Sequence, residues 1–145
     1  MELASKDKEG AIREIAESLC VTENITDCEE FVKDVFVREA LGSTGIGNNV
    51  GIPHARTSAV KGCVIGFGKS QQGIEFNALD GEKVNFIFLI GVDPGTLHLY
   101  LGILAELSKL IMSDFFRQTL ISASTVADVI DIIKKFEQEE RRGRS

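Results

Sequence analysis

The stretch Val84–Val92 constrains the fold of this 145-residue chain more than any other. It reads V-N-F-I-F-L-I-G-V and is apolar on both of the faces that a strand would present. Such a run is typical of a central strand that other elements cover on both sides. Asp80-Gly81, shortly before it, is a hairpin signal, which predicts at least one antiparallel neighbour.

Two amphipathic helices are predicted near the start of the chain. Ser5 can cap the first, because the apolar residues that follow it recur at helical spacing. Residues 27–30 read D-C-E-E, which resembles a capping box that opens the second helix, and Gly42 ends that helix. Between these helices and the central strand, short strands are predicted at 63–67 and 74–76.

Helical patterns continue after the central strand. Thr96 can cap one helix, a second opens at Ser113 or Asp114 and runs to Leu120, and Thr125 opens a third. Together, these predicted helices and strands indicate an α/β fold: a single-domain three-layer α/β/α sandwich around a small mixed β-sheet. We expect this one domain to occupy residues 1–145, with about 137–145 as a frayed tail.

The composition is that of an ordinary soluble globular protein, and it disfavours several classes of partner. Apolar residues make up 43% of the chain and the formal net charge is −6. This acidity argues against nucleic acid or an anionic membrane as the main partner. The start of the chain lacks the apolar core of a signal peptide, and no apolar run approaches the roughly 20 residues of a membrane span. We therefore expect a cytoplasmic protein.

The cysteines and histidines predict neither a disulfide nor a metal site. Cys20, Cys28 and Cys63 are odd in number and form no C-x-x-C pair, which fits a reducing compartment and inert packing roles. His54 and His98 lie far apart in the sequence, so the spacing of a zinc site is missing.

Residues 44–57, T-G-I-G-N-N-V-G-I-P-H-A-R-T, are predicted to form a loop rich in glycine and asparagine. Its G-x-G pair follows a helix and lacks Lys-Ser/Thr, so a mononucleotide site is rejected. The backbone N–H groups of such a loop can instead converge into an anion-binding nest. The nest residues are Thr44, Gly45, Gly47 and Asn48. Beside a nest, the imidazole of His54 can take a phosphoryl group as a nucleophile, and the alternative is a structural turn with an incidental histidine.

Two further residues allow both a functional and an ordinary interpretation. Arg38 falls in the last turn of the second predicted helix, on its inward face, where it can either bind the helix's own C-terminal carbonyls or point at the glycine loop. His98 falls in the first turn of the helix after the central strand, where an anionic neighbour is favoured. A histidine at a helix start can equally be a surface or packing residue.

The sequence resembles the mannitol/fructose-type enzyme IIA of the bacterial phosphotransferase system, a family that includes the nitrogen-regulatory IIA proteins. Residues 38–48 read R-E-A-L-G-S-T-G-I-G-N, and residues 52–56 read I-P-H-A-R, which together look like the family signature. Later landmarks, L-D-G-E-K-V at 79–84 and H-L at 98–99, follow in the same order. The resemblance covers nearly the whole chain.

The resemblance implies a phosphotransferase activity with no cofactor and no metal. His54 would be the phosphorylated residue, accepting a phosphoryl group from the carrier HPr or an HPr-like protein and passing it to a cysteine of an enzyme IIB. Arg38 matches the family's active-site arginine and His98 its second active-site histidine. Membrane association would be only indirect, through a IIBC permease.

Two functions from different classes fit this resemblance. One is a phosphoryl carrier in fructose/mannitol-type sugar transport, and the other is a nitrogen-regulatory protein that controls partner proteins through the phosphorylation state of His54. For either, the partner-docking face is predicted to be the apolar rim of the loop at Ile46, Val50 and Ile52. The family's usual strand ahead of the first helix is largely missing, so we expect this edge of the sheet to differ from the family pattern.

Overall fold

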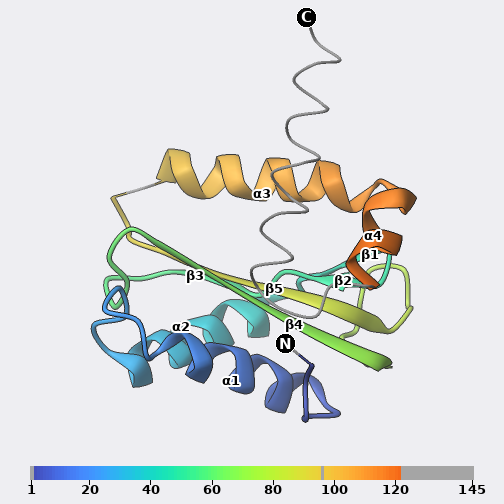
Figure 1. The fold of residues 1–145 in the computed structure, drawn as a ribbon. Coiled ribbons are helices and arrows are strands. Elements are labelled where there is room, and N and C mark those ends of the chain that lie inside the picture. The colour runs from blue at the N-terminus through green and yellow to red at the C-terminus, as the bar shows by residue number, and fades with distance from the viewer. Residues whose placement is uncertain (1, 96, 122–145) are drawn as a thin grey trace, which may run out of the picture.

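The structure, a computed structural model, describes residues 2–95 and 97–121. Figure 1 shows a sheet between two helical layers, with α1 (Lys8–Leu19) and α2 (Cys28–Leu41) on one face and α3 (Leu97–Ile111) on the other. The short helix α4 (Asp114–Ile121) follows α3 at one end of the same layer. The three-layer α/β/α arrangement predicted from the sequence is therefore confirmed.

The central strand of the mixed sheet is β5 (Val84–Val92), as its apolar pattern predicted. On one side β5 pairs with two short parallel strands in succession, β2 (Val50–Gly51) and β3 (His54–Arg56). On the other side it pairs antiparallel with β4 (Cys63–Ile74), which confirms the predicted antiparallel neighbour. Strand β1 (Gly45–Gly47) extends the sheet antiparallel to β2.

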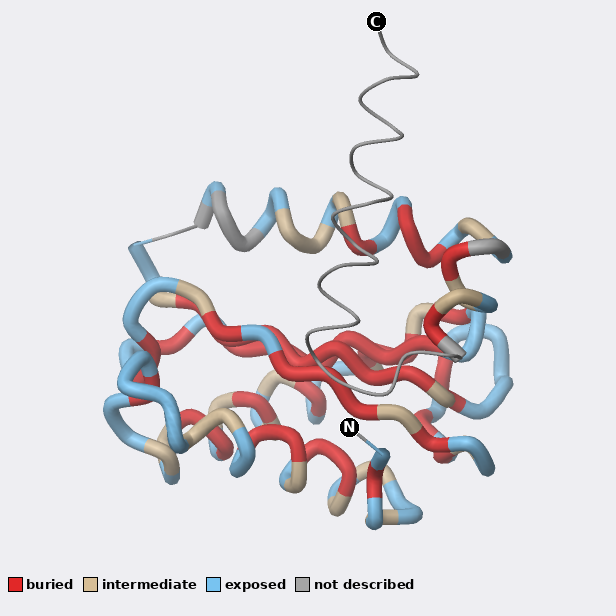
Figure 2. Tube along the Cα trace, in the orientation of Figure 1, coloured by how far each residue is buried: buried red, intermediate tan, exposed pale blue. Residues whose placement is uncertain are grey.

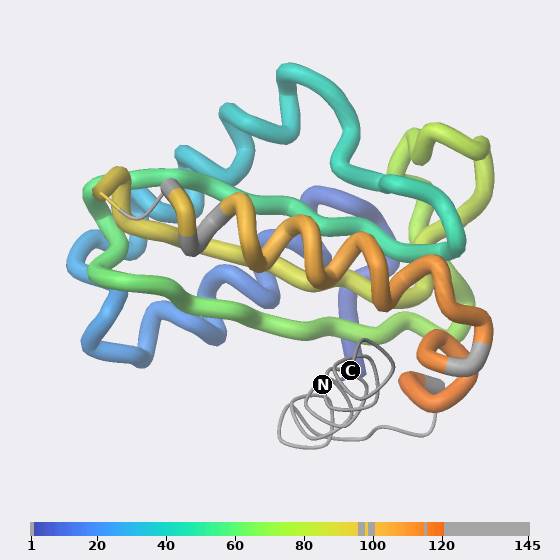
Figure 3. The backbone as a smooth tube through the Cα atoms, turned by 90° about the horizontal axis from the view of Figure 1, so that it is seen from above, coloured from blue at the N-terminus to red at the C-terminus, as the bar shows by residue number. Residues whose placement is uncertain are grey.

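Two hydrophobic cores lie on the two faces of the sheet. Figure 2 shows the buried residues concentrated along the strands and on the helix faces turned toward them. The core under α1 and α2 includes Ile12, Ile15, Phe31, Val35, Phe76 and Leu89. The core under α3 and α4 includes Phe67, Phe88, Ile90, Leu107, Phe116 and Leu120. Seen from above in Figure 3, α3 lies over the middle of the sheet.

The predicted helix caps are confirmed in α2 and corrected in α1. The Asp27 carboxylate accepts the N–H of Glu30 at 3.1 Å, and Gly42 ends α2. In α1, Asp7 rather than Ser5 is the cap, because its carboxylate reaches the N–H of Gly10 at 2.7 Å.

Two strand predictions also differ from the structure. Strand β4 continues from 63 to 74 rather than stopping at 67, because its ladder to β5 resumes after an irregularity that Gly73, at φ +82°, accommodates. The separate strand predicted at 74–76 is not found, because β4 itself ends at Ile74. Ahead of α1, where the sequence indicated that the family's usual strand is largely missing, there is a single bridge between Glu2 and Lys69.

The prediction that no disulfide forms is wrong, because Cys20 and Cys28 are joined. Cys20 follows α1 and Cys28 begins α2, and the turn between the two helices brings their Cα atoms to 5.5 Å, within the ordinary range for a disulfide. Sequence spacing alone does not reveal this approach, since it depends on how the helices are joined.

Several predictions concern parts of the chain outside the described residues. These are the cap at Thr96, the helix opened by Thr125 and the tail at 137–145. Among the helices that the structure describes, none is long and apolar enough to cross a membrane.

Candidate active site

His54 is held by a break in the sheet edge between β2 and β3. The break falls at Ile52-Pro53, yet the Pro53 carbonyl oxygen still accepts the N–H of Ile90 at 3.0 Å, so the chain remains on β5. His54 is only 8% exposed, and its side chain turns back so that Nδ1 lies 2.8 Å from the Ile52 carbonyl oxygen. A carbonyl oxygen can only accept, so Nδ1 carries the proton and Nε2 holds the lone pair of the neutral ring.

The surroundings of His54 lower its pKa from the usual 6.5. Burial is the largest cause, because it disfavours the charged ring. The hydrogen bond to Ile52 opposes this effect, the positive charge of Arg38 lowers the pKa further, and the negative charge of Glu39 raises it. The ring is thus held toward its neutral form.

Residues 45–51, predicted as part of an open loop, form a β-hairpin of β1 and β2. Its turn residues Asn48 and Asn49 have φ of 56° and 65°, the left-handed conformation that a two-residue turn of type I′ requires at both positions. Gly45 and Gly51 let the hairpin lie against neighbouring chain, since a Cβ on either would meet Ala78 at 2.8 Å or Phe76 at 3.0 Å.

The N–H groups of this hairpin already have acceptors at three of the four predicted nest residues. Thr44 donates to a carboxylate oxygen of Glu39 at 2.9 Å, and Gly45 donates to the Ser43 hydroxyl at 3.0 Å. Asn48 donates to the Asp80 carboxylate at 3.2 Å. A phosphoryl oxygen would reach these three groups only by displacing those partners.

The two ends of the hairpin lie at different distances from His54. Val50 pairs with Phe86 and His54 with Ile90, a separation of four residues along β5, or roughly 13 Å. Thr44 is at the near end, because its carbonyl oxygen accepts the Ile52 N–H at 3.0 Å. The turn at Asn48 is at the far end.

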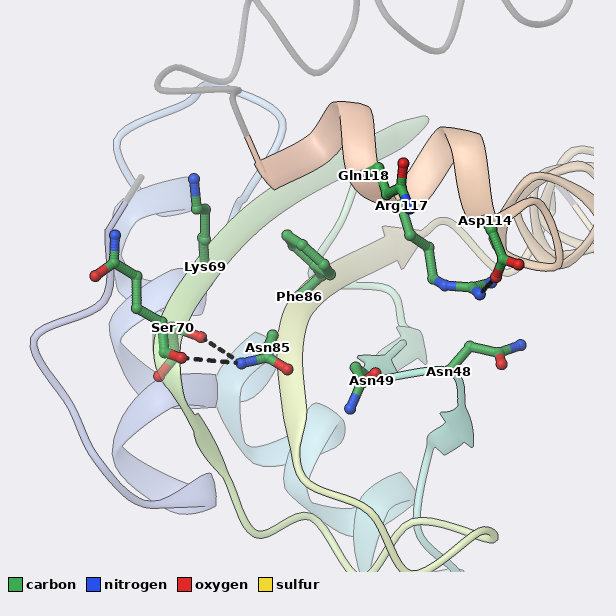
Figure 4. A pocket seen from close by; sticks show the side chains of 10 residues that line it. Asn48, Asn49, Lys69, Ser70, Asn85, Phe86, Asp114, Arg117 and Gln118 are labelled. Carbon is green, nitrogen blue, oxygen red and sulfur yellow. Dashed lines mark hydrogen bonds and ion pairs between the residues drawn. The ribbon is translucent and has the colours of Figure 1, made fainter.

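The far end of the hairpin borders a separate cavity of about 510 Å³. Figure 4 shows Asn48 and Asn49 on one side of this cavity and Arg117 of α4 on another, with Phe86 between Lys69 and Arg117. Within this cavity, the side-chain amide of Asn85 donates hydrogen bonds to the carbonyl oxygens of Ser70 and Gln71. This cavity includes none of His54, His98 and Arg38 among its lining residues.

Arg38 lies in the last turn of α2 and does what the simpler interpretation of the sequence predicted. Its Nη1 donates to the Gly42 carbonyl oxygen at 3.0 Å, which caps the helix end. Its charge also lowers the pKa of His54, so the two residues interact electrostatically. The capping contact and the influence on His54 are therefore both present.

Glu39, next to Arg38, is a buried residue of the site that the sequence interpretation missed. Its carboxylate accepts the N–H and the hydroxyl of Thr44 at 2.9 and 2.6 Å, and Lys8 Nζ lies 2.6 Å away. The signal was available, since Glu39 falls four residues after buried Val35 and so shares its inward face. A charged residue at that position needs a partner.

His98 lies in the first turn of α3, as predicted, and is exposed. It lines an apolar cavity of about 490 Å³ together with Phe88 and Ile90 of β5. Ile90 is also the ladder partner of His54. The structure therefore places both histidines on the α3 face beside the same part of β5, one from the sheet and one from the helical layer.

The predicted docking rim is wrong at two of its three positions. Val50 and Ile52 are buried in the core under α3, and only Ile46 is partly exposed. Large apolar side chains near the hairpin base that do face solvent are Leu41, at the end of α2, and Leu79, whose N–H donates to the Gly45 carbonyl oxygen at 3.0 Å. Within 2–95 and 97–121, His, Cys, Asp and Glu side chains form no group of three that could hold a metal ion.

Comparisons with known proteins identify the family to which this arrangement belongs. The family model described as phosphoenolpyruvate-dependent sugar phosphotransferase system, EIIA 2, matches residues 1–136. The chain is 33% identical over 138 residues to the fructose-specific EIIABC component of Bacillus subtilis (strain 168), an alignment covering 95% of this chain but 22% of that protein. It thus spans less than a quarter of that relative's length.

Two further similarities extend over most of both chains. The fructose-specific EIIA component of Haloferax volcanii is 32% identical over 126 residues, covering 87% of this chain and 82% of that protein. The crystal structure of nitrogen regulatory protein IIA-Ntr from Neisseria meningitidis matches with a TM-score of 0.83 at 27% identity, covering 92% of this chain and 90% of that one. The chain belongs to the EIIA type 2 family of the phosphoenolpyruvate-dependent sugar phosphotransferase system, whose members are phosphotransferase components with a phosphohistidine intermediate.

Proposed function

We propose that the chain is a phosphoryl carrier and that His54 carries the phosphoryl group on Nε2. The orientation of the ring is the observation that supports this most directly. Because the Ile52 carbonyl oxygen, 2.8 Å away, holds the Nδ1 proton, the lone pair of the neutral ring is on Nε2. The lowered pKa keeps the ring neutral, and therefore nucleophilic, at about pH 7.

The proposed transfer has two balanced steps. In the first, the Nε2 lone pair of His54 attacks the phosphohistidine phosphorus of HPr or an HPr-like carrier, and the N–P bond of the donor breaks with its electron pair returning to the donor imidazole. In the second, a cysteine thiolate of an enzyme IIB attacks the same phosphorus, forming an S–P bond and returning the lone pair to Nε2. The donor is already a phosphohistidine, so positioning and charge stabilisation are what the protein must supply.

Arg38 and His98 are the proposed stabilisers of the transferring group. The guanidinium of Arg38 has five N–H donors, of which the contact to Gly42 uses one nitrogen, so the planar group can also bind phosphoryl oxygens. His98 can supply a second donor from the α3 layer. Of the predicted cradle residues Thr44, Gly45, Gly47 and Asn48, Gly45 lies near the hairpin base and can bind a phosphoryl oxygen in exchange for its bond to the Ser43 hydroxyl. Thr44 is held by Glu39, and Gly47 and Asn48 lie toward the far end of the hairpin, roughly 13 Å from His54 along β5, so we do not assign these three to the cradle.

We propose sugar transport of the fructose/mannitol type as the process that the carrier serves. The fructose-specific descriptions of the Bacillus and Haloferax relatives support it. The Bacillus relative joins A, B and C components in one chain, which supports an enzyme IIB as the acceptor. It also supports a cytoplasmic chain whose association with a membrane is only indirect, through a IIBC permease. The alternative is nitrogen regulation through the phosphorylation state of His54, favoured by the match to the Neisseria IIA-Ntr structure.

The test of the carrier function is phosphate incorporation from labelled phosphoenolpyruvate in the presence of enzyme I and HPr. The wild-type chain should take up one acid-labile phosphoryl group, and His54→Ala should take up none. His98→Ala serves as the matched control, because it removes the other histidine and should slow uptake without abolishing it. Labelling that persists in His54→Ala contradicts the assignment.

The choice between the two processes rests on the acceptor. A chain phosphorylated on His54 should lose its label to a fructose- or mannitol-type enzyme IIB, and not to the same IIB with its active cysteine replaced by serine. If no enzyme IIB accepts the label from a competent donor chain, the regulatory alternative is the better one.

A further inference from the structure

A continuous series of contacts links a buried ion pair to the ring of His54. Lys8 Nζ lies 2.6 Å from Glu39 Oε1, and Thr44 donates both its N–H and its hydroxyl to the Glu39 carboxylate. The Thr44 carbonyl oxygen accepts the Ile52 N–H at 3.0 Å. The Ile52 carbonyl oxygen in turn accepts from His54 Nδ1 at 2.8 Å. The series thus runs from α1 through α2 and the hairpin base to β3.

Glu39 is the residue of this series whose side chain is most firmly held in place, because its carboxylate is buried. Its side chain is only 6% exposed and its carboxylate receives three donors, so losing any one of them would leave a buried charge poorly compensated. Lys8 is held independently, because its Nζ also donates to the Phe76 carbonyl oxygen at 3.2 Å and lies 4.7 Å from the centre of the Phe76 ring. A fully satisfied buried network of this kind is rigid.

We propose that Glu39 is a positioning residue for His54: by anchoring Thr44, it holds the Ile52 carbonyl where that oxygen selects the Nδ1–H tautomer of the ring. The inference rests on the proposed function, in which this tautomer leaves Nε2 as the phosphoryl acceptor. Glu39 does not touch the reacting atoms. It acts through two intervening residues, each held to the next by a hydrogen bond.

The competing explanation is that the Lys8–Glu39 pair only stabilises the fold. A buried ion pair is costly to break on one side, so a single substitution could impair activity through unfolding alone. The two explanations differ in the tautomer of His54, which a purely structural role would leave unchanged in any variant that remains folded. Nitrogen-15 shifts of the neutral ring report this tautomer, and they require no phosphoryl donor.

The experiment compares Glu39→Gln and Thr44→Val with the wild-type chain. We expect the Nδ1–H form to dominate in the wild type and the Nε2–H form to become populated in both variants. Phosphorylation by phospho-HPr should slow by roughly tenfold or more, because the nucleophile is no longer held in place. The double variant Lys8→Met/Glu39→Gln removes both charges, so it should regain thermal stability lost by Glu39→Gln while keeping the shifted tautomer.

Glu9→Gln is the matched control, since Glu9 is an exposed partner of Arg13 on α1 and should leave tautomer and rate unchanged. Wild-type tautomer and rate in Glu39→Gln and Thr44→Val would overturn the proposal. So would a double variant in which tautomer and rate return to wild-type values together with stability. Failure of the carrier function looks different: the wild-type chain would take up no phosphate, whereas the tautomer shift would still be measurable.

Discussion

At the scale of single residues, opposing influences set the pKa of the His54 ring. Burial and the charge of Arg38 lower its pKa, whereas the hydrogen bond to Ile52 and the charge of Glu39 raise it. The net effect is a lowered pKa that favours the neutral ring, because desolvation is the largest influence. A neutral ring with a fixed tautomer is what a nucleophilic histidine requires.

This balance predicts how the stability of the fold depends on pH. Unfolded His54 binds a proton near pH 6.5, whereas the folded ring has a lower pKa and resists protonation. The contribution of the neutral ring is therefore fully present above 6.5 and is lost as the pH falls through 6.5 toward the folded value. We expect the free energy of unfolding of the wild type, relative to that of His54→Gln, to decrease below pH 6.5.

The measurement is urea unfolding of the two proteins at a series of pH values. Taking the difference cancels carboxylates and other groups that titrate equally in both chains. A difference that stays constant from about pH 7.5 to about pH 5 would show that folding does not disfavour the charged ring.

At the scale of elements, glycines in the sheet set how closely the α1/α2 layer packs. A Cβ on Gly66 or Gly68 of β4 would lie within 2.7 or 2.6 Å of Ile15 in α1. A Cβ on Gly91 of β5 would lie 2.6 Å from the ring of Phe31 in α2. The absence of side chains at these three positions therefore lets both helices lie close to the strands.

Gly91→Ala is the sharpest test of this packing. Phe31 is fully buried and its ring is rigid, so it cannot yield to the new methyl group as a long side chain end could. We expect a loss of about 1–3 kcal/mol in the free energy of unfolding, measured in urea. Gly102→Ala in α3 is the control, because a Cβ there meets nothing within 4 Å and should be neutral or stabilising by up to about 1 kcal/mol. Equal stability of Gly91→Ala and wild type would contradict the packing argument.

The elements also show how far the sequence could predict this fold. The continuous apolar pattern identified β5, and the capping box identified the start of α2, because both signals are local. The hairpin was missed because strands of three and two residues are too short for periodicity to register. At the site, His54 and Arg38 stand in a recognisable motif, whereas the contact of Glu39 with Thr44 depends on how the chain turns between the end of α2 and the start of β1.

At the scale of the whole molecule, the candidate site is assembled from all three layers. His54 comes from the sheet, Arg38 and Glu39 come from α2 below it, and His98 comes from α3 above it (Figure 1). No single layer contains the set. Under the proposed function, a partner that delivers or removes a phosphoryl group is expected to dock where these layers meet, beside the base of the hairpin.

Leu79 is an exposed apolar residue beside the hairpin base, where it can contact such a partner. It is 82% exposed, and its N–H is bonded to Gly45, next to Thr44 at the end of the hairpin nearer His54. We expect Leu79→Asp to raise the KM for phospho-HPr by roughly tenfold, since a charge would replace an apolar contact at the interface. Phosphorylation of His54 by a small donor such as phosphoramidate should be unchanged, because no docking is involved.

The control for this prediction must match both exposure and charge. Met112, at the other end of the α3 layer from His98, is 78% exposed, and Met112→Asp adds the same negative charge to a chain whose net charge is already −6. If the effect of Leu79→Asp were general repulsion, Met112→Asp would raise the KM equally. If docking occurs at the hairpin base, only Leu79→Asp raises it, and the rate with phosphoramidate separates that loss from damage to His54 itself.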